Sequence, residues 1–594
     1  MARSKLVGAS VVVGLAALTL AASSFADQDL TRSTTVAATP TVFPADLMIE
    51  ATGADEIDGE IVVDVRDDAS ASDIADLATK FGLTLRAAST WSAEHDKLEI
   101  ADVDPAHEDE ILQALANDPR VEHAERMSLL HASFVPNDPL YDAKQWHLKR
   151  VGAESAWEYT CGRGVTVAVI DTGVACFDKG PFMKGTDLQG TRCEGGYNFV
   201  DNNTDAYDDH GHGTHVAGTI AQTTNNGMGT AGLAYCATLM PVKVLSKQGY
   251  GTVAAVADGI RFAADNGAQV INMSLGGPIK SKILEDAVSH AIKKGALIVA
   301  AAGNSGRSVG WPAAYPGVVA VSATDSNDKI AWFSSRGPEV AIAAPGVGVT
   351  QQTVCNGGKD KCEIFGTFSG TSMASPHVAG VAAMIVGAGV TDIDSVRASL
   401  TSTAVAKDDA KLYGAGIVDA AKAVARAHWL HLALRLVALV ALFALVASRI
   451  KRQGGEVVRT PGGLVGALFA AVGLLPFAPL LHLGTIAGPL RWVVELLQRP
   501  FGEWDILLGV GIHKWLPLAS ALPVVALTML FFGVKRLRFA VGGFALGTAA
   551  LLAQLALSAD VAFVGGSMLL RVYAFASAAV CLWIARIGLD AKKA

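Results

Sequence analysis

Charged residues are scarce in this chain of 594 residues: they make up 18% of the sequence, against 51% hydrophobic residues, and the formal net charge is −8. A disordered or fibrous chain is more polar, so this composition excludes both classes. The mean hydropathy of +0.36 indicates that part of the chain lies in a membrane. No long basic run is present, which argues against nucleic acid as a partner.

The first 26 residues have the pattern of a secretory signal. Arg3 and Lys5 precede an apolar run over residues 6–22, and Ser24 and Ala26 are the small residues before a cleavage site. A retained N-terminal anchor is the alternative. Both interpretations predict that the chain after residue 26 is exported.

Residues 27–56 are rich in Thr and Ala and are expected to form a linker, and residues 57–130 are expected to form a small α+β domain of ferredoxin-like type. The periodicity in this second segment predicts alternating strands and helices. The expected strands are 60–65, 97–100 and 121–125, and the expected helices are 72–81 and 108–115.

Residues 131–426 alternate apolar, β-branched runs with Gly- and Ala-rich helical segments. Uninterrupted apolar strands are typical of a parallel sheet that is buried on both faces, so we expect an α/β domain with helices on both sides of the sheet. The expected strands are 165–170, 238–244, 270–273, 297–301 and 318–321.

Residues 427–594 are predicted to be an all-α membrane domain with about five spans, at 429–450, 464–483, 515–532, 539–557 and 561–584. Basic clusters follow the first, third and fifth spans. The positive-inside rule therefore places the C-terminus in the cytoplasm and the preceding domains outside a bacterial plasma (inner) membrane, on its periplasmic or extracellular side.

Between the second and third spans lies an amphipathic stretch, with Arg491, Glu495 and Gln498 opposite an apolar side. We expect it to lie on the membrane surface. For the membrane domain as a whole the sequence leaves two roles open, a bundle anchor and a module that binds a membrane partner or regulates the enzyme.

Four segments of the α/β domain carry the residue types of nucleophilic catalysis. Residues 167–174 read VAVIDTGV, so that Asp171 ends an apolar strand, and 209–218 read DHGHGTHVAG, with His212 between glycines. Residues 299–306 read VAAAGNSG and place Asn304 after a strand. Residues 370–380 read GTSMASPHVAG, with Ser372 at the start of a helix of small residues.

These four segments, in this order, resemble the motifs of the subtilisin-like serine peptidases, and most of all those of the thermitase-like branch. The resemblance covers about residues 136–426, and the small domain is similar to the family's inhibitory propeptide. It implies a subtilisin-like fold, Ser372 as nucleophile, His212 as general base and Asp171 as the group that orients His212. Asn304 and the Ser372 backbone N–H would form the oxyanion hole.

The same resemblance implies a cleft for protein or peptide substrates, which would pair with the enzyme as an extended strand. Lys247 is the one charged residue of the matching segments, so an apolar or bulky side chain is expected before the scissile bond. The implied substrate-binding residues are Gly249, Tyr250, Gly251, Ser274, Leu275, Gly276, Ala301 and Gly303.

The resemblance to the thermitase-like branch also implies a structural Ca²⁺, held by two carboxylates, an amide and main-chain carbonyls. The implied ligands are Asp138, Asp187, Thr223, Asn226, Met228 and Thr230. A second calcium site around Asp201, Asn203 and Asp205 is left open, with a solvated loop as its alternative. No organic cofactor is expected.

None of the seven cysteines forms a CxxC pair, which argues against a zinc ribbon or a thioredoxin-like centre. Six of them precede residue 427, and an even number in an exported domain favours disulfides. Cys355–Cys362 is the first expected pair and Cys176–Cys193 the second, while other pairings and free thiols stay open.

The sequence thus predicts a membrane-anchored, exported serine endopeptidase that matures by cutting off its own propeptide, at a bond near Leu130 or His131. The alternative is a catalytically silent, subtilase-like membrane sensor or scaffold. Cleavage within the bilayer is excluded, because the four motifs lie outside the predicted spans.

Overall fold

The computed structural model describes residues 56–128, 135–178, 184–354, 364–485, 489–508, 520–558 and 568–593. The predicted signal peptide, the linker up to residue 55, Leu130, His131, Cys355 and Cys362 lie outside these ranges. The chain forms two compact units, one over residues 31–132 and one that contains residues 133–594. Each unit is described by itself.

The small unit is a four-stranded antiparallel sheet with the order β2-β3-β1-β4, covered by helices. Along β1, Ile61, Val63 and Val65 are fully buried and pack with Leu77 of α2, as the alternation of a half-buried strand requires. The predicted strands and helices are confirmed to within a few residues, and the structure adds β2 and α3. The elements are β1 (Glu56–Val65), α2 (Ala71–Phe81), β2 (Arg86–Ala87), α3 (Thr90–Glu94), β3 (Leu98–Asp102), α4 (Glu108–Ala116) and β4 (Val121–Ser128).

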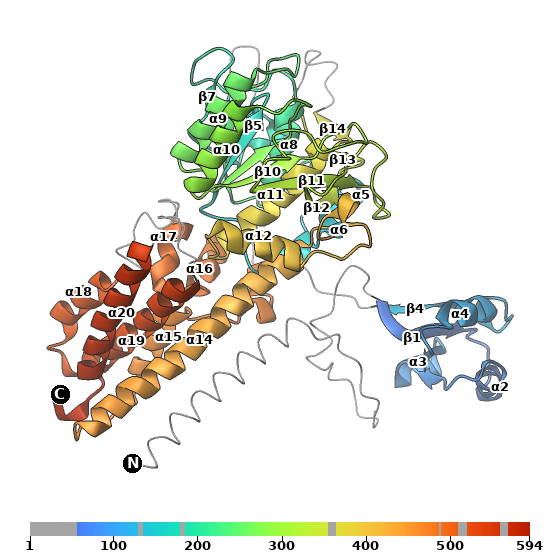
Figure 1. The fold of residues 1–594 in the computed structure, drawn as a ribbon. Helices are drawn as coiled ribbons and strands as arrows, with labels where there is room; N and C mark the ends of the chain where they lie inside the picture. The colour runs from blue at the N-terminus through green and yellow to red at the C-terminus, as the bar shows by residue number, and fades with distance from the viewer. Residues whose placement is uncertain are drawn as a thin grey trace. The chain divides into compact units, whose positions relative to one another are not determined.

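The large unit contains the predicted parallel sheet, whose strand order is β12-β11-β10-β9-β5-β8-β6, with β7 also paired to β8 (Figure 1). Every one of the five predicted strands is present: the ends of 270–273 and 297–301 agree, and the other ends differ by at most three residues. The strands are β5 (Thr166–Asp171), β6 (Arg192–Cys193), β7 (Tyr197–Asn198), β8 (Thr238–Lys243), β9 (Val270–Met273), β10 (Leu297–Ala301), β11 (Val318–Thr324) and β12 (Val340–Pro345).

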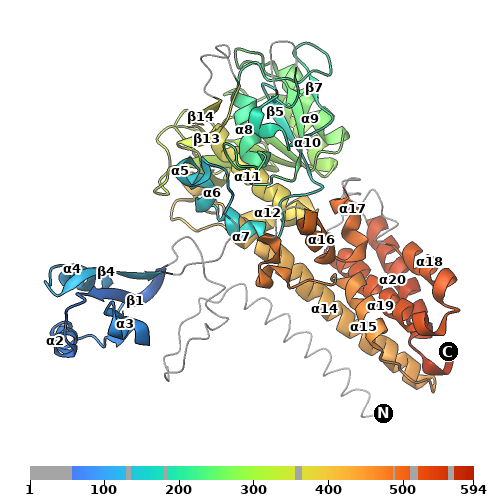
Figure 2. The same cartoon turned by 180° about the vertical axis from the view of Figure 1, so that it is seen from behind.

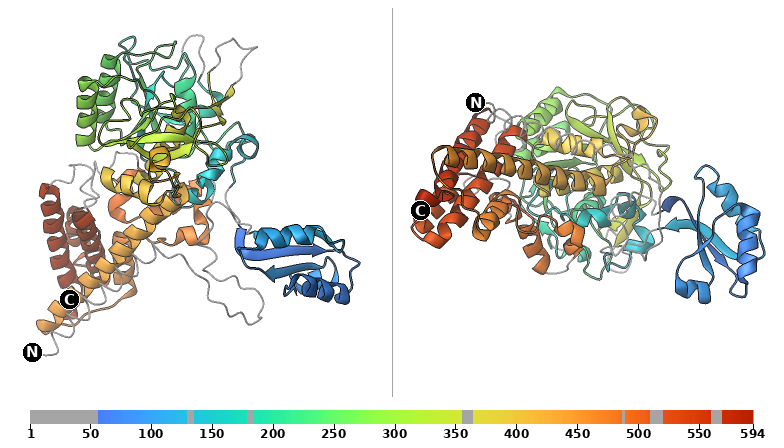
Figure 3. Two further views of the ribbon diagram at one scale, coloured as in Figure 1. Left: turned by 45° about the vertical axis from the view of Figure 1, so that its right-hand side comes forward. Right: turned by 90° about the horizontal axis from the view of Figure 1, so that it is seen from below.

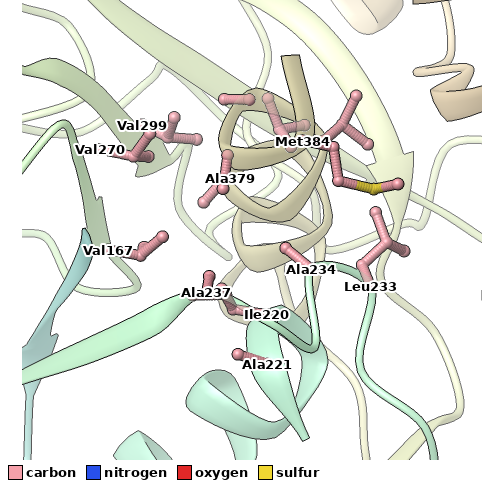
Figure 4. Close-up of a cluster of buried hydrophobic side chains, with 14 of the residues drawn as sticks. Val167, Ile220, Ala221, Leu233, Ala234, Ala237, Val270, Val299, Ala379 and Met384 are labelled. Atoms are coloured by element: carbon pink, nitrogen blue, oxygen red, sulfur yellow. The ribbon is translucent and has the colours of Figure 1, made fainter. Parts of the chain in front are cut away.

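Helices cover both faces of this sheet, and residues of β5 alternate between the two cores. Val167 and Val169 pack on the side of α8 (His212–Ala221) and α11 (Thr371–Gly387), whereas Ala168 and Ile170 pack on the side of α9 (Val253–Asp265) and α10 (Lys282–Lys293). Figure 4 shows Val167, Val270 and Val299 of the sheet facing α11 at Ala379. Both faces of the sheet are therefore buried, which explains why its strands are uninterrupted apolar runs.

Shorter elements complete the sheet domain. They are α5 (Tyr141–Lys144), α6 (Trp146–Arg150), α7 (Ala153–Trp157), η2 (Thr186–Leu188), β13 (Val349–Gln352), β14 (Phe365–Phe368), α12 (Ile393–Ser402) and α13 (Ala410–Tyr413).

A single helix of 33 residues, α14 (Ala420–Arg452), connects the sheet domain to the C-terminal helices (Figures 1 and 2). Asp419 caps its first turn through a hydrogen bond from the Lys422 backbone N–H (2.8 Å). The remaining elements are α15 (Pro461–Ala471), η3 (Ala478–Leu481), η4 (Leu483–Thr485), α16 (Pro489–Leu497), η5 (Phe501–Glu503), α17 (Trp504–Leu507), α18 (Leu522–Phe531), α19 (Lys535–Ser558), α20 (Met568–Gly588) and η7 (Ala591–Lys593).

Three of these helices, α14, α19 and α20, are long and apolar enough to cross a bilayer, with mean hydropathies of 2.4, 1.7 and 1.8 in their most apolar windows. They coincide with the first, fourth and fifth predicted spans. The second predicted span is different, because the helix α15 ends at Ala471 and short 3₁₀ turns follow. In the third, the described part is a helix of 10 residues, α18.

Glycine allows α15 and α19 to pack with their backbones in contact. A Cβ atom on Gly543 would lie 1.9 Å from the carbonyl oxygen of Gly463, and one on Gly547 would lie 2.2 Å from that of Ala467. Both pairs have the same sequence offset, so the two helices run parallel. This close approach through small residues is typical of helix pairs in membranes.

The glycine contact can be tested by adding one methyl group. We expect Gly543→Ala to lower stability by about 1–3 kcal/mol, the usual effect of overpacking a closely packed site. Gly533→Ala is the matched control, because no atom lies within 4 Å of its added Cβ. Thermal unfolding of the full chain in detergent measures both. Equal midpoints of thermal unfolding for the two variants would contradict the close contact between α15 and α19.

Candidate active site

Asp171 is the last residue of β5 and is fully buried at the carboxyl end of the sheet. Its Oδ1 accepts hydrogen bonds from His212 Nδ1 (2.7 Å) and from the Thr172 backbone N–H (2.8 Å). A carboxylate can only accept, so the contact fixes the proton of His212 on Nδ1 and leaves Nε2 free to act as a base.

Two glycines bring the first turn of α8 against the end of β5. Gly211 has a φ of 104°, and a Cβ on Gly213 would lie 2.1 Å from the carbonyl oxygen of Gly173. The Gly213 backbone N–H donates to Thr172 Oγ1 (2.9 Å). The glycines on either side of His212 are therefore required for the contact with Asp171.

Asp208 holds the loop that carries His212, and sequence reasoning missed it. It is fully buried, its Oδ1 accepts from Thr172 Oγ1 (2.8 Å), and its Oδ2 accepts from the backbone N–H and hydroxyl of Thr214. The only sequence signal for Asp208 is its place as a second acid directly before the segment that contains His212. Because it bonds to both the Asp171 turn and α8, Asp208 positions the two catalytic candidates relative to each other.

The pKa of His212 reflects two opposed effects. Burial lowers it, but the charge of Asp171 and the hydrogen bond to it outweigh burial, and the net result is a pKa raised above the usual 6.5. The imidazole keeps 23% of its side-chain surface exposed. His212 can therefore be reached by a substrate and is set up to accept and return a proton near neutral pH.

Ser372 lies in the first turn of α11, which buried polar contacts attach to the end of β9. Its hydroxyl donates to the carbonyl oxygen of Ser274 (3.1 Å), and Ser274 Oγ donates to the carbonyl oxygen of Ser372 (2.7 Å). One turn further on, Ser375 Oγ donates to Asn272 Oδ1 (2.7 Å). Among the described residues no hydrogen bond joins Ser372 to His212 in this conformation, and such contacts commonly form only with substrate bound.

Asn304 follows β10 and is oriented by the same helix end. Its Oδ1 accepts from the backbone N–H and the hydroxyl of Thr371, both at 2.9 Å. No described residue accepts a hydrogen bond from its Nδ2. The amide therefore presents a free donor beside the start of α11, as an oxyanion hole requires.

The four predicted catalytic positions thus come together, since β10, β9 and β5 are neighbours in the sheet and end at one edge. Of the other motif histidines, His210 accepts from the His212 backbone N–H (3.3 Å), whereas His215 and His377 are fully buried. Burial lowers the pKa of His215 to about 3 and that of His377 to about 4, so both are neutral at physiological pH. His377 Nδ1 donates to the Met373 carbonyl (2.8 Å), and this fixes its ring.

The predicted substrate-binding residues lie on three segments. Gly249, Tyr250 and Gly251 form an exposed turn, in which the Tyr250 side chain is 80% exposed. Ser274, Leu275 and Gly276 follow the end of β9, and the next residue, Gly277, pairs with Trp311 through an isolated bridge. Ala301 ends β10, and Gly303 donates its backbone N–H to Thr371 Oγ1 (3.1 Å).

The predicted calcium ligands converge on two buried carboxylates. Asp138 accepts from the backbone N–H groups of Asn225 and Asn226, and Asp187 accepts from Asn226 Nδ2 (2.8 Å) and the Thr230 backbone N–H (2.9 Å). No basic side chain contacts either carboxylate among the described residues. Burial raises the pKa of both, that of Asp187 to about 7.

Thr223 and Met228 flank this pair of carboxylates: the Thr223 backbone N–H donates to the Asp187 carbonyl (3.2 Å), and that of Met228 donates to Asn226 Oδ1 (2.9 Å). Two buried carboxylates that lack a basic partner are the hard, charged ligands that Ca²⁺ prefers. Around the possible second site, the side-chain oxygen of Asn203 accepts from the Asp205 backbone and that of Asp201 accepts from Asn198, as in an ordinary loop.

Two disulfides join described cysteines. Cys176–Cys193 confirms the second expected pair. Cys161–Cys236 was not singled out, because its 75-residue separation gives no local signal. The remaining described cysteine, Cys581, is free and buried in α20.

Comparisons with known proteins agree with this geometry. The model of the subtilase family matches residues 162–417 and ends before α14. A thermophilic serine proteinase of Bacillus sp. (strain AK1) is 39% identical over 351 residues, which are 59% of this chain and 82% of that protein. Thermitase of Thermoactinomyces vulgaris is 40% identical over 293 residues, 49% of this chain and 99% of that protein.

Among solved structures, a protease from Pseudoalteromonas arctica PAMC 21717 is 35% identical in sequence. The match covers 49% of this chain and 99% of that protein, with a TM-score of 0.44.

The raised pKa of His212 predicts the acid limb of the pH profile. Hydrolysis requires the neutral imidazole, so kcat/KM should fall as the pH drops through an apparent pKa above 6.5. In Asp171→Asn the largest effect that raises the pKa of His212 is removed, and burial is opposed only by the weaker effect of Asp208. The limb should therefore move to lower pH while kcat falls by about 10⁴. Rate–pH profiles of both proteins test this; an unchanged limb in the variant would show that Asp171 does not set the pKa.

The carboxylate pair predicts a pH-dependent response to Ca²⁺. Because the native pKa of Asp187 is raised, the ion-free protein loses stability as the pH rises toward 7 and the buried carboxyl ionises. A bound cation reverses this effect, so Ca²⁺ should bind more tightly as the pH rises from 6 to 8. At about 100 times its Kd, Ca²⁺ should stabilise the protein by about 2.7 kcal/mol.

Thermal unfolding with Ca²⁺ and with a chelator measures this stabilisation. In Asp187→Asn the difference should vanish, whereas Asp201→Asn, in the loop of the possible second site, serves as the matched control. A calcium response that is the same in Asp187→Asn and in the wild type would place the ion elsewhere.

Proposed function

This chain belongs to the subtilase family and is a serine peptidase, and from that premise we propose that Ser372, His212 and Asp171 are its catalytic triad. The observation that carries the proposal is the 2.7 Å hydrogen bond from His212 Nδ1 to the buried carboxylate of Asp171, beside the start of the helix that bears Ser372. We propose endopeptidase activity on exported proteins.

In the first half of the reaction, the Ser372 hydroxyl turns from the Ser274 carbonyl toward His212, and Nε2 takes its proton as Oγ attacks the carbonyl carbon of the scissile bond. Asp171 stabilises the imidazolium that forms. The C–N bond then breaks, His212 returns the proton to the leaving amine, and an acyl group stays on Oγ. In the second half, water attacks by the same route and releases the acid.

The negative oxygen of each tetrahedral intermediate would be held by Asn304 Nδ2 and the Ser372 backbone N–H. Because Thr371 fixes Asn304 through Oδ1, the donor is already oriented before charge develops. Donors arranged in this way typically contribute a factor of about 10²–10³ to turnover.

Residues 249–251 and 274–276 would bind an extended polypeptide on either side of the cleft, as a strand added by main-chain hydrogen bonds. The described side chains of these segments are uncharged. Because these segments lack charge, we expect a preference for substrates with an apolar or bulky side chain before the scissile bond.

We further propose that residues 57–130 are the propeptide, removed near Leu130 or His131 by the enzyme itself. The compact α+β fold of residues 56–128, which forms a unit separate from the sheet domain, supports this. The same domain would act as folding assistant and inhibitor until cleavage.

The C-terminal helices would anchor the enzyme in a bacterial plasma membrane. The basic ends of the long helices lie together: Lys592 Nζ donates to the Gly454 carbonyl after α14 (2.7 Å), and Arg538 of α19 donates to the Ile587 carbonyl of α20 (3.3 Å). The positive-inside rule favours the cytoplasm for this end and the outer face for the peptidase.

We propose five crossings, although three helices have full length. The chain leaves α14 at the basic end, contacts the sheet domain again at Arg491 and Glu495 of α16, and starts α19 at the basic end. These contacts support a path that would cross outward with α15 and return with α18.

We propose Ca²⁺ at Asp138 and Asp187 as a structural ion only. It would supply the positive charge that these two buried carboxylates lack. No step of peptide hydrolysis involves it.

Self-cleavage gives the test of this function. In the wild type we expect the intact mass and N-terminal sequence to show loss of residues up to about 130, and in Ser372→Ala we expect those residues to be retained. Ser375→Ala, three residues along the same helix, is the control for folding and should still process.

If the wild type and Ser372→Ala both keep the small domain, and the wild type does not hydrolyse an unfolded protein such as casein, the chain is a silent scaffold. Cleavage of both at the same bond would show processing by another protease.

A further inference from the structure

The helix α14 is shared by two hydrophobic cores. Ala423, Val424 and Ala427 pack in the core of the sheet domain, whereas Leu439 and Val446 pack in the core of the membrane helices. No glycine or proline interrupts residues 420–452, which form a rod about 50 Å long at 1.5 Å per residue. Proline and glycine are common causes of kinks, and α14 runs as one α-helix from Ala420 to Arg452 (Figure 3).

A second attachment is made by α16, whose polar side docks on the sheet domain. Arg491 donates to the Trp157 carbonyl (2.7 Å) and to Glu495 (3.2 Å), and Arg163 donates to Glu495 (2.7 Å). The guanidinium of Arg491 also lies over the Tyr235 ring, 5.4 Å from its centre. The Arg491 and Glu495 side chains are 8% and 6% exposed, so the contact is dry.

The opposite side of α16 is apolar and uncovered. Leu490, Trp492 and Val493 are 63%, 40% and 41% exposed, and Leu480 and Leu481 of the preceding turn are 54% and 66% exposed. A helix with its polar side on protein and its apolar side free is suited to lie on a bilayer. The sheet domain would therefore rest on the membrane surface through α16.

The candidate active site is at the far end of the sheet domain from this attachment. Arg163 lies just before β5, and this strand of six residues, about 20 Å long at about 3.3 Å per residue, ends at Asp171. Along α11, Ser372 is at one end, and at the other Gly389 approaches Glu503 of η5, with 3.1 Å from its added Cβ to Oε2. The 17 residues of α11 span about 25 Å.

From these observations we propose that the C-terminal region fixes the active site about 20–25 Å above the outer membrane surface, and that the enzyme selects among membrane-attached substrates by distance. This inference rests on the proposed function. An extended chain covers about 3.3 Å per residue, so a scissile bond needs at least about eight residues between it and the bilayer. With a flexible linker, about 20 residues match this height.

The substrate class is therefore polypeptides that are soluble or that extend well away from the bilayer, and cleavable sequences close to a membrane span are spared. Fixed height also keeps the peptidase from cutting the outer loops of its own membrane domain.

The test uses the full chain in vesicles together with single-span reporter proteins. Each reporter carries one cleavable sequence, placed 4, 8, 16, 24 or 32 residues of Gly/Ser linker from its span, and a soluble peptide of that sequence normalises activity. We expect the reporters with 24 and 32 residues to be cut at least tenfold faster than the one with 4. Equal rates along the series would overturn the proposal.

A matched variant separates fixed height from simple crowding at the bilayer. It carries ten Gly/Ser residues inserted between Ala427 and His428 together with Arg491→Ala and Glu495→Ala, so that α14 is interrupted and the polar contacts of α16 with the sheet domain are removed. If it hydrolyses the soluble peptide normally, we expect cleavage of the 4-residue reporter to rise toward that of the long ones; an unchanged spacing dependence would overturn the proposal.

If this insertion impairs the soluble reaction, the same ten residues placed between Leu430 and His431, beyond the last α14 residue of the sheet-domain core, provide the comparison with the same two outcomes. Failure of the wild type to cut even the soluble peptide would instead refute the proposed function.

Discussion

The contact between Asp171 and His212 is the interaction on which the rest of the site depends. It exists because a parallel strand ends in a buried carboxylate and because Gly213 allows α8 to approach the turn at Gly173. An uncompensated carboxylate at this depth would be costly. The hydrogen bond to His212 offsets that cost, and the same bond gives the imidazole the tautomer and the raised pKa that catalysis needs.

The second constraint is the helix α14, which makes the membrane region part of the peptidase. The family model ends at residue 417, just before α14 begins. Yet Val424 of α14 lies in the core of the sheet domain. In addition, the buried Arg491 and Glu495 of α16 form hydrogen bonds with the sheet domain. An anchor that served only to tether would need neither contact.

Sequence reasoning reached the sheet, the four motif residues and one disulfide because each has a local signal. It missed Asp208 and Cys161–Cys236, whose partners are set by the fold and not by spacing. The amphipathic stretch predicted to lie on the membrane surface forms α16, whose apolar side is exposed; the burial of its polar side on the sheet domain had no local signal. Hydropathy predicted five spans of similar length. The second differs, because α15 ends at Ala471 although the sequence stays apolar beyond it, and hydropathy does not detect such a helix end.

The central claim is that Ser372 is a nucleophile that His212 activates. The most direct measurement is covalent labelling of the full chain with a fluorophosphonate, followed by peptide mass spectrometry. The account predicts one adduct, on Ser372, that forms more slowly as the pH falls below the raised pKa of His212 and that is lost in His212→Ala. Labelling of another serine, or none in a folded and processed chain, would contradict it.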